Sequence, residues 1–458
     1  MNARRLILVS LCGVVSVLVF SSASAVAFET HVASQSIGSG EKGTGAGQLE
    51  LAGRSGVAVD QATGDVYIAD TGNDRVDELE PSGAFMRAWG WGVADGLAKF
   101  EACGPDAFPP TVTCQAGISG SGAGEFESPT FVAVDNDPAS ASFGDVYVGD
   151  HGDVLVTKFN AEGALVSAWG DTTPTPNGQL GPFGQPGSSF SQMYGITVDA
   201  SGDLGVAYAV NTATKLAQFN QEGGRIAEHA VAFSDLAPDG AAVDSEGNLF
   251  LANIPGDEDP GVQESQSSGG RVGLLSTSEN PTGLAVDPAT GDLYVDTGRS
   301  VEQFVFSGSG VVSEQGGTTC TVAVEGGGGS PPEVKCPATK AFGAGEIGAG
   351  AGVAVDSSTH DVYVADASTS RIDVFEPAIV PDTATAAAKE VKGHSATLAG
   401  TVDPDGEGAA KCQFVWGTTK EFGHTGPCEP AEVEGNTPVA VTAKITEQIG
   451  RASCRERV

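Results

Sequence analysis

The fold is decided by a stretch that recurs along the chain, and its clearest copy reads Gly56-Val57-Ala58-Val59-Asp60, a short turn, and Asp65-Val66-Tyr67-Ile68-Ala69-Asp70. The Val-Asp ending returns at Asp135, Asp199, Asp244, Asp287 and Asp356, so successive copies are 75, 64, 45, 43 and 69 residues apart. A four-stranded propeller blade takes about 40–45 residues, which matches the shortest spacings, and the longer ones correspond to the same unit with insertions. The sequence therefore predicts an all-β protein built around a six-bladed β-propeller.

Period-two alternation predicts four strands in the first unit, over 57–59, 65–70, 75–79 and 84–90. The sixth unit reaches Pro377 after three strands, whereas Thr30–Gly38 is a spare strand ahead of the first unit. We expect this spare strand to pair with Arg371–Phe375 and complete the last blade. An open ring would leave strand edges unpaired, and closure removes them.

These units resemble the repeats of the NHL family over roughly residues 28–377. The resemblance rests on Asp65–Asp70 with Asn73 and Arg75, and on Asp361–Asp366 with Arg371. The third and fourth units depart from the pattern, because Asn211 and Asn253 stand where the family has Asp. NHL repeats form propeller blades, so the resemblance implies the same architecture as the spacing.

The N-terminus has the pattern of an export signal. Arg4 and Arg5 precede the apolar stretch Leu6–Phe20, and small residues offer cleavage sites after Ala25 or Ala27. We expect residues 1–27 to be a signal peptide and the protein to be secreted or held at the surface of a bacterium. An uncleaved membrane anchor is the alternative.

A second module follows the repeats. Residues 378–383 are expected to form a linker, and residues 384–448 resemble the start of a fibronectin type III-like β-sandwich of bacterial surface proteins. This is shorter than the ~100 residues of a typical sandwich, so a partial domain is predicted. Residues 449–458 (IGRASCRERV) match a translated sequencing adapter, and we interpret them as an assembly artefact. A native basic tail is the alternative.

Six of the 8 cysteines fall into three local pairs once Cys12 and Cys454, in the two end segments, are set aside. An even number in an exported chain favours disulfides. The predicted pairs are Cys103 with Cys114, Cys320 with Cys336, and Cys412 with Cys428. Zinc binding is the competing interpretation, although no C-x-x-C motif and no neighbouring histidine supports it.

The net charge of the chain excludes some classes of binding partner. It carries 23 Lys and Arg against 59 Asp and Glu, a formal charge of −36. Nucleic-acid binders need basic patches, and so do proteins that bind anionic membranes. No apolar run after the leader reaches the ~20 residues of a membrane span. We therefore expect a monomer with no nucleic-acid partner and no integral span, which leaves divalent cations and cationic or neutral partners.

The insertions point to one face of the ring. Trp91–Glu127, Asp171–Ser191 and Gly316–Gly350 are expected between strand four of one unit and strand one of the next, and Ile254–Gly270 between strands two and three. All four would share a face, which is typical of a binding surface on a repeat scaffold. Neutral decoration of the surface is the alternative.

Ligand chemistry is sparse. Asp257, Glu258 and Asp259 are weak candidates for calcium, which prefers clustered carboxylates, but they lack the D-x-D-x-D-G pattern and could form a solvated acidic loop. The repeated Val-Asp carboxylates are expected to hydrogen-bond their turns rather than to bind ligands. No other metal, cofactor or catalytic residue is assigned.

The sequence favours a non-catalytic function. The six histidines, His31, His151, His229, His360, His394 and His424, are scattered, and no nucleophile elbow or P-loop is present. We predict an exported binding or scaffold protein of the bacterial cell surface, with a protein or glycan ligand on the face that bears the insertions. A metal-dependent propeller lyase or hydrolase is the alternative.

Overall fold

The computed structural model describes two compact units. Described are residues 29–457 except 112, 123, 152–154, 167–178, 181–189, 211–212, 222, 235–239, 254–259, 266–270, 308–309, 313–317, 322–334, 380–381, 393–394, 405–408, 418–423, 436 and 447–452. The larger unit is His31–Pro377, and the smaller one includes Ala378–Val458. The predicted signal peptide, residues 1–27, lies outside the described residues.

The larger unit is built mainly from sheets of four or five strands. The first three sheets follow the chain in order. Their strands are β2 (Val57–Val59), β3 (Val66–Asp70), β4 (Arg75–Leu79), β5 (Phe85–Trp91) and β6 (Phe100–Cys103); β7 (Pro129–Val134), β8 (Val146–Asp150), β9 (Leu155–Phe159) and β10 (Gln179–Leu180); β11 (Phe190–Val198), β12 (Leu204–Val210), β13 (Ala213–Phe219) and β14 (Arg225–Ser234).

The next three sheets each recruit a strand from elsewhere in the chain. Their strands are β15 (Ala241–Val243), β16 (Leu249–Asn253), β17 (Gly261–Ser265), β18 (Arg271–Ser276) and β25 (Lys335–Pro337); β19 (Gly283–Val286), β20 (Leu293–Asp296), β21 (Val301–Phe304) and β26 (Lys340–Phe342); β27 (Gly350–Val355), β28 (Val362–Asp366), β29 (Arg371–Ile379) and β1 (Glu29–Ile37). A small separate sheet holds β22 (Phe306–Ser307), β23 (Gly310–Val312) and β24 (Thr318–Thr321). The helix in the described ranges is one 3-10 turn, Thr71–Asn73.

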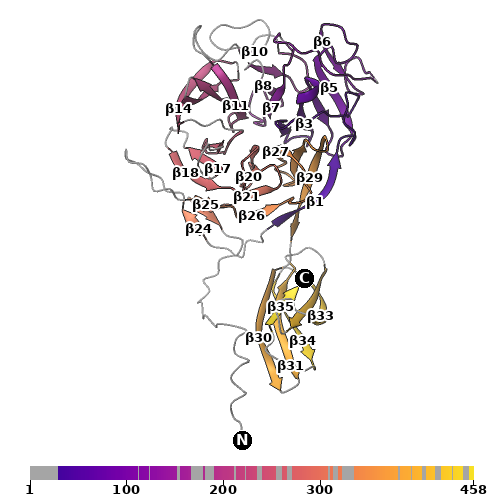
Figure 1. Cartoon of the computed structure of the whole chain (residues 1–458), viewed down its shortest axis with the longest axis vertical. Coiled ribbons are helices and arrows are strands. Elements are labelled where there is room, and N and C mark those ends of the chain that lie inside the picture. Colours follow the sequence, from indigo (N-terminus) through magenta and orange to yellow (C-terminus); the bar gives the residue numbers. More distant parts are fainter. Residues whose placement is uncertain are drawn as a thin grey trace. The chain divides into compact units, whose positions relative to one another are not determined.

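The sheets stand around a common centre (Figure 1). The first strand of each sheet contacts the first strand of the next, in the order β2, β7, β11, β15, β19 and β27, and β27 contacts β2. Five of these strands have three to six residues and are rich in Val and Ala, while β11 has nine residues and ends in Ile196-Thr197-Val198. The arrangement is a β-propeller.

The core is divided into layers between neighbouring sheets. Six clusters of buried apolar side chains each join two adjacent sheets, and one of them joins the first sheet to the last. The second residue of strand two supplies a buried ring to the next layer in five sheets: Tyr67, Tyr147, Phe250, Tyr294 and Tyr363. The third sheet has Gly205 there, and the layer after it is the smallest of the six. The recurring aromatic of the sequence motif thus fills the gap between blades.

Glycine permits the close approach of the sheets where their first strands begin. A Cβ on Gly56 would lie 2.8 Å from the carbonyl oxygen of Thr130, and one on Gly352 would lie 2.7 Å from that of Ser55. Backbone hydrogen bonds cross these same gaps, from Gly56 N to Thr130 O (2.8 Å) and from Ser55 N to Ala351 O (3.1 Å). The Gly that precedes the repeated apolar triplet is therefore a packing requirement.

The N-terminal strand β1 lies beside β29 at the outer edge of the last sheet. Side chains secure the pair: Ser36 Oγ donates to Asp373 Oδ1 (2.7 Å) and Ser34 Oγ to Val374 O (3.2 Å). The pairing that we expected between Thr30–Gly38 and Arg371–Phe375 is therefore present. It joins residues more than 330 positions apart in the sequence.

Two predicted insertions are placed differently in the structure. Most of Gly316–Gly350 precedes the fourth strand of its sheet, β26, and so belongs to the connection from strand three to strand four. That connection lies on the opposite face from the one predicted. Strand β26 has three residues, too few to show alternation in the sequence. Likewise, Ile254–Gly270 contains the third strand, β17, whose polar residue Gln263 is buried.

The other two insertions differ in how much of them is described. Trp91–Glu127 follows the fourth strand β5 as predicted and adds a fifth strand, β6. Asp171–Ser191 falls largely outside the described residues, apart from β10, which pairs with β9, and the first two residues of β11. The insertions therefore do not all share one face. We call the face with the connections two-to-three and four-to-next the loop face, and the opposite one the turn face.

The smaller unit is a single sheet of six strands in the order β30-β31-β34-β33-β32-β35. The strands are β30 (Asp382–Lys392), β31 (Ser395–Asp403), β32 (Ala409–Gly417), β33 (His424–Glu434), β34 (Val439–Ile445) and β35 (Ser453–Arg457). They enclose a core with Leu398, Phe414 and Val441. β35 lies in the predicted adapter segment and pairs with β32. Across the described ranges, no helix combines the length and the apolar character that a membrane crossing requires.

Candidate functional site

The insertion after β5 is an ordered subdomain on the loop face. Residues 92–128, apart from 112 and 123, are described. Backbone hydrogen bonds hold it to the first sheet: Ile118 N donates to Trp91 O and Gly117 N to Asn73 O, both at 2.7 Å. Cys103 and Cys114 form a disulfide across it, as the sequence predicted. We call residues 92–118 the braced loop.

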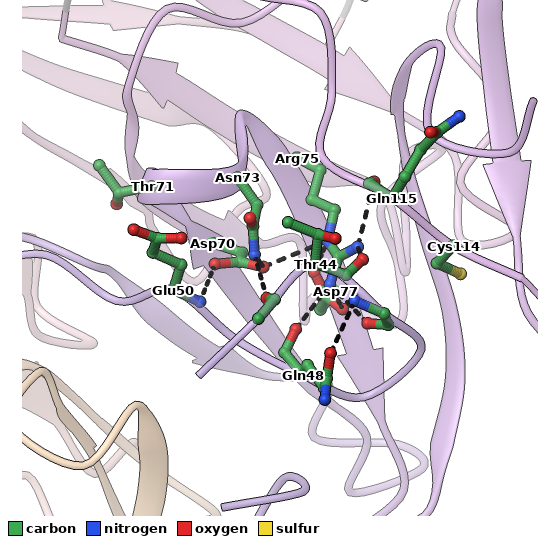
Figure 2. A network of polar contacts seen from close by, with 12 residues as sticks. Thr44, Gln48, Glu50, Asp70, Thr71, Asn73, Arg75, Asp77, Cys114 and Gln115 are labelled. Atoms are coloured by element: carbon green, nitrogen blue, oxygen red, sulfur yellow. Dashed lines mark hydrogen bonds and ion pairs between the residues drawn. The ribbon is translucent and has the colours of Figure 1, made fainter. Parts of the chain in front are cut away.

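Arg75 anchors the braced loop to the ring (Figure 2). Its guanidinium is fully buried and donates to the carbonyl oxygens of Thr44 (2.6 Å), Gly45 (3.1 Å) and Gln48 (2.7 Å) in the lead-in segment, and of Gln115 (3.2 Å) next to Cys114. It also bonds the carboxylates of Asp70 and Asp77. One side chain on β4 therefore joins the lead-in, the first sheet and the insertion.

The charges of this network are unbalanced, since one guanidinium meets two carboxylates. Asp70, Arg75 and Asp77 have no solvent-exposed side-chain surface. Burial raises the pKa of Asp77 well above its ordinary value and also raises that of Asp70, while the attraction of Arg75 opposes both shifts. Removal of Arg75 would leave two buried acids without their cation.

Apolar side chains project from the braced loop into solvent. Among the described residues, seven large hydrophobic side chains are exposed, and three of them are in this loop: Phe108 (98 %), Leu97 (60 %) and Ile118 (40 %). Phe108 is followed by Pro109 and Pro110, which restrict the backbone at that point. Exposed aromatic groups on a rigid support are typical of protein-binding surfaces.

The repeated Val-Asp carboxylates serve the turns, as the sequence analysis expected. Each accepts a backbone N–H two residues further along the chain. The pairs are Asp60 with Ala62, Asp135 with Asp137, Asp199 with Ser201, Asp244 with Glu246, Asp287 with Ala289, and Asp356 with Ser358. They thereby fix the six turns that surround the centre of the turn face.

The Asp at the end of strand two has a role that the sequence analysis did not assign. Asp70, Asp150 and Asp366 accept backbone N–H groups of the incoming segment, from Glu50 (2.7 Å), Glu127 (2.5 Å) and Ala349 (3.0 Å) respectively. The recurrence of this Asp at the end of the motif D-V-Y-x-x-D is the sequence signal that could have predicted this role. In the fifth sheet Asp296 accepts from Gly298 N instead, and its Oδ2 has no partner among the described residues. Burial raises the pKa of Asp296 to about 7.

The structure brings together two histidines that lie far apart in the sequence. His360 Nδ1 is 2.6 Å from Asp287 Oδ2, and its carbonyl oxygen is 3.0 Å from His31 Nε2 on β1. His31 is buried between the rings of Tyr294 and Phe342, and this burial lowers its pKa to about 4. The contacts link the fifth and sixth sheets to the N-terminal strand. Sequence reasoning missed them because the three residues share no motif.

The remaining predicted residues are partly described. His151 lies in the larger unit, and His424 stacks on Trp416 in the smaller one, whose Cys412 and Cys428 form the predicted disulfide. Cys336 is disulfide-bonded. The side chain of Cys320, its predicted partner, is not among the described ones, and neither is that of His229. His394 lies outside the described residues. Asp257, Glu258 and Asp259 also fall outside them. Within the described part of the chain, no three His, Cys, Asp or Glu residues are grouped as metal ligands.

A cavity of about 480 Å³ occupies the centre of the ring, lined by β2, β7, β11, β15, β19 and β27 and by the turns that follow them. Its walls are mostly Val, Ala, Ile and Leu. The polar residues of its lining lie mainly in the turns, among them Asp137, Asp199 and Asp244.

Comparisons with known proteins give similarity at the level of structure. No protein-family model and no curated protein sequence matches the chain. Solved structures that resemble it include a chain of the mitotic checkpoint complex (11 % identity, TM-score 0.45, covering 79 % of this chain and 98 % of that chain). Another is a catalytically inactive virginiamycin B lyase from Staphylococcus aureus with quinupristin (11 % identity, TM-score 0.40, covering 80 % of this chain and 94 % of that chain). A third is a gluconolactonase from Xanthomonas campestris (13 % identity, TM-score 0.42, covering 77 % of this chain and 100 % of that chain).

Replacing Arg75 tests the anchor of the braced loop. Arg75→Met leaves Asp70 and Asp77 buried without a cation, which should lower the free energy of unfolding by roughly 3–5 kcal/mol. The control is Lys42→Met in the lead-in segment, where the ion pair to Glu50 is solvent-exposed and its loss should change little. Chemical denaturation measures both variants. Equal effects of the two substitutions would contradict the role of Arg75.

Asp296 gives the protein a predictable pH dependence. Its pKa rises from 3.8 to about 7 on folding, so its protonated form favours the folded state. Its stabilising contribution is complete below pH 4 and is lost as the pH rises to 7, at roughly 1 kcal/mol per pH unit. Asp296→Asn keeps the acceptor for Gly298 and should flatten this slope between pH 5 and 7. An unchanged slope in denaturation curves would show that Asp296 ionises normally.

Proposed function

We propose that the protein is an exported, non-catalytic propeller that binds a protein partner at the bacterial cell surface through its braced loop. The proposal includes six blades of the NHL type in a closed ring, with β1 completing the last blade, and a partial fibronectin type III-like module after it. The single observation that carries the binding function is Phe108, an aromatic side chain that is 98 % exposed on a disulfide-braced support.

The contacts between neighbouring sheets support the architecture in this proposal. Six first strands touch in a cycle, one apolar layer fills each gap between sheets, and β1 pairs with β29. These features are what a closed six-bladed ring requires, because closure removes exposed sheet edges.

A protein partner suits the braced loop better than a glycan does. Hot spots in protein interfaces are aromatic or apolar side chains that enter a pocket on the partner. The disulfide and the bonds of Arg75 order the loop before binding, so less conformational entropy is lost on association. The described loop carries Asp95, Lys99, Glu101 and Asp106, which favours a partner with a basic rim.

The non-catalytic part of the proposal is supported by how the polar groups are used. The recurring carboxylates accept backbone N–H groups of turns and lead-in segments, and the walls of the central cavity are largely aliphatic. Groups that are committed to such bonds are poorly placed for acid–base chemistry.

A matched pair of substitutions tests the binding surface. Phe108→Ser should weaken capture of the partner from bacterial surface extracts at least tenfold, because it removes the anchor. Phe143→Ser, on the turn face and 42 % exposed, should leave capture unchanged. Immobilised wild-type and variant proteins are compared by quantitative mass spectrometry of the bound fraction.

Two outcomes would contradict the proposal. Equal capture by both variants would exclude the braced loop, and release of the partner by free oligosaccharides would identify a glycan ligand instead. The same preparation should contain no stoichiometric metal by elemental analysis; one equivalent of tightly bound metal would favour the lyase or hydrolase alternative.

A further inference from the structure

The central cavity is wide on the turn face and narrows where the first strands begin, and we call it the funnel. The wide part, about 480 Å³, includes residues of the turns after the first strands, such as Gln61, Asn136 and Ser245. A separate space of only about 60 Å³ lies where these strands begin. There Gly56 and Gly352 bring the backbones of adjacent sheets into direct contact. The turn face therefore offers a ligand much more room than the narrow end does.

The wall of the funnel is suited to an apolar body. Its strands contribute mainly aliphatic residues, among them Val57, Val132, Ile196, Leu284 and Val353. The volume lies within the range of ~300–1,000 Å³ that small-molecule sites occupy. Hydrogen bonds between neighbouring sheets hold the wall in place: Gln61 Nε2 donates to Val355 O, and Asn136 Nδ2 donates to Val59 O. The cavity is thus part of the folded ring.

The mouth of the funnel is negatively charged. The charged residues that line it are Asp137, Asp199 and Asp244, and no Lys, Arg or His is among its described lining residues. The Oδ1 atom of each of these carboxylates accepts backbone N–H groups of its turn. Among the described ion pairs, none neutralises these three residues.

One nearby acid, Glu264, is affected first by its burial and then by the same charge. Glu264 is largely buried behind the mouth, and its pKa is raised to about 7 by desolvation together with the charges of Asp244 and Glu246. Low-dielectric walls concentrate such a field within a cleft and raise the local concentration of oppositely charged ligands. The apolar wall suits an apolar body, and the acidic mouth suits a cationic group on the same ligand.

We propose that the funnel binds a small amphipathic amine, with an apolar body against the aliphatic wall and a cationic group attracted to the acidic mouth that Asp137, Asp199 and Asp244 line. The site is on the face opposite to the braced loop and does not depend on the function proposed for that loop. A bare metal ion fits less well, because the described residues provide no group of three metal ligands.

Calorimetry with simple probes tests both parts of this site. Hexyltrimethylammonium should bind the full chain with one site per molecule. Hexanoate, which has the same body and the opposite charge, should bind at least tenfold more weakly, and so should tetramethylammonium, which lacks the body. Equal binding of hexyltrimethylammonium and hexanoate would overturn the role of the acidic mouth, and equal binding of the two ammonium ions would overturn that of the wall.

Variants locate the binding in the funnel. Asp137→Asn with Asp199→Asn keeps the Oδ1 acceptors of both turns and should weaken binding of hexyltrimethylammonium about tenfold. The control is Asp106→Asn, an exposed carboxylate on the braced loop, which should leave binding unchanged. If the double variant does not fold, competition on the wild type decides: octylammonium should displace the probe one for one. Unchanged affinity in the double variant, or no displacement, would overturn the proposal.

Discussion

The structure depends on the requirement that every sheet of the larger unit has a neighbour on both sides. The apolar core is not one interior but a series of layers, so each layer exists only while two sheets stay adjacent. The critical layer joins the first sheet to the last, with Val57 and Ile68 on one side and Tyr363 and Ile372 on the other. It brings together segments about 300 residues apart in the sequence, and β1 extends the last sheet behind it.

This regular ring leaves the two faces free to differ. On the loop face, the lead-in segments are held by the Asp at the end of strand two, and Arg75 extends this arrangement into the braced loop. On the turn face, the Val-Asp carboxylates fix six short turns around the mouth of the funnel. The same residue type therefore supports a protruding apolar surface on one side and a concave acidic one on the other. Two different kinds of ligand suit these two surfaces.

Repetition determined what the sequence could predict. The Val-Asp turns, the pairing of Thr30–Gly38 with the last unit and two of the disulfides follow from patterns that recur or pair locally. Strands β17 and β26 were missed, since one is mostly polar and the other has three residues. The bonds of Arg75 to Thr44, Gln48 and Gln115 were also missed, because backbone carbonyls carry no signal in the sequence. The same holds for His31, His360 and Asp287, which meet only after the ring has formed.

Complementation in trans tests the closed ring most directly. A chain that begins at residue 39 lacks β1 and should unfold at lower temperature, because β29 then has an unpaired edge. Adding a peptide of residues 29–38 should restore the thermal midpoint in a saturable manner, and a scrambled peptide should not. This result would establish β1 as the strand that completes the last blade. A shortened chain that melts like the full one, or that gains nothing from the peptide, would contradict the account.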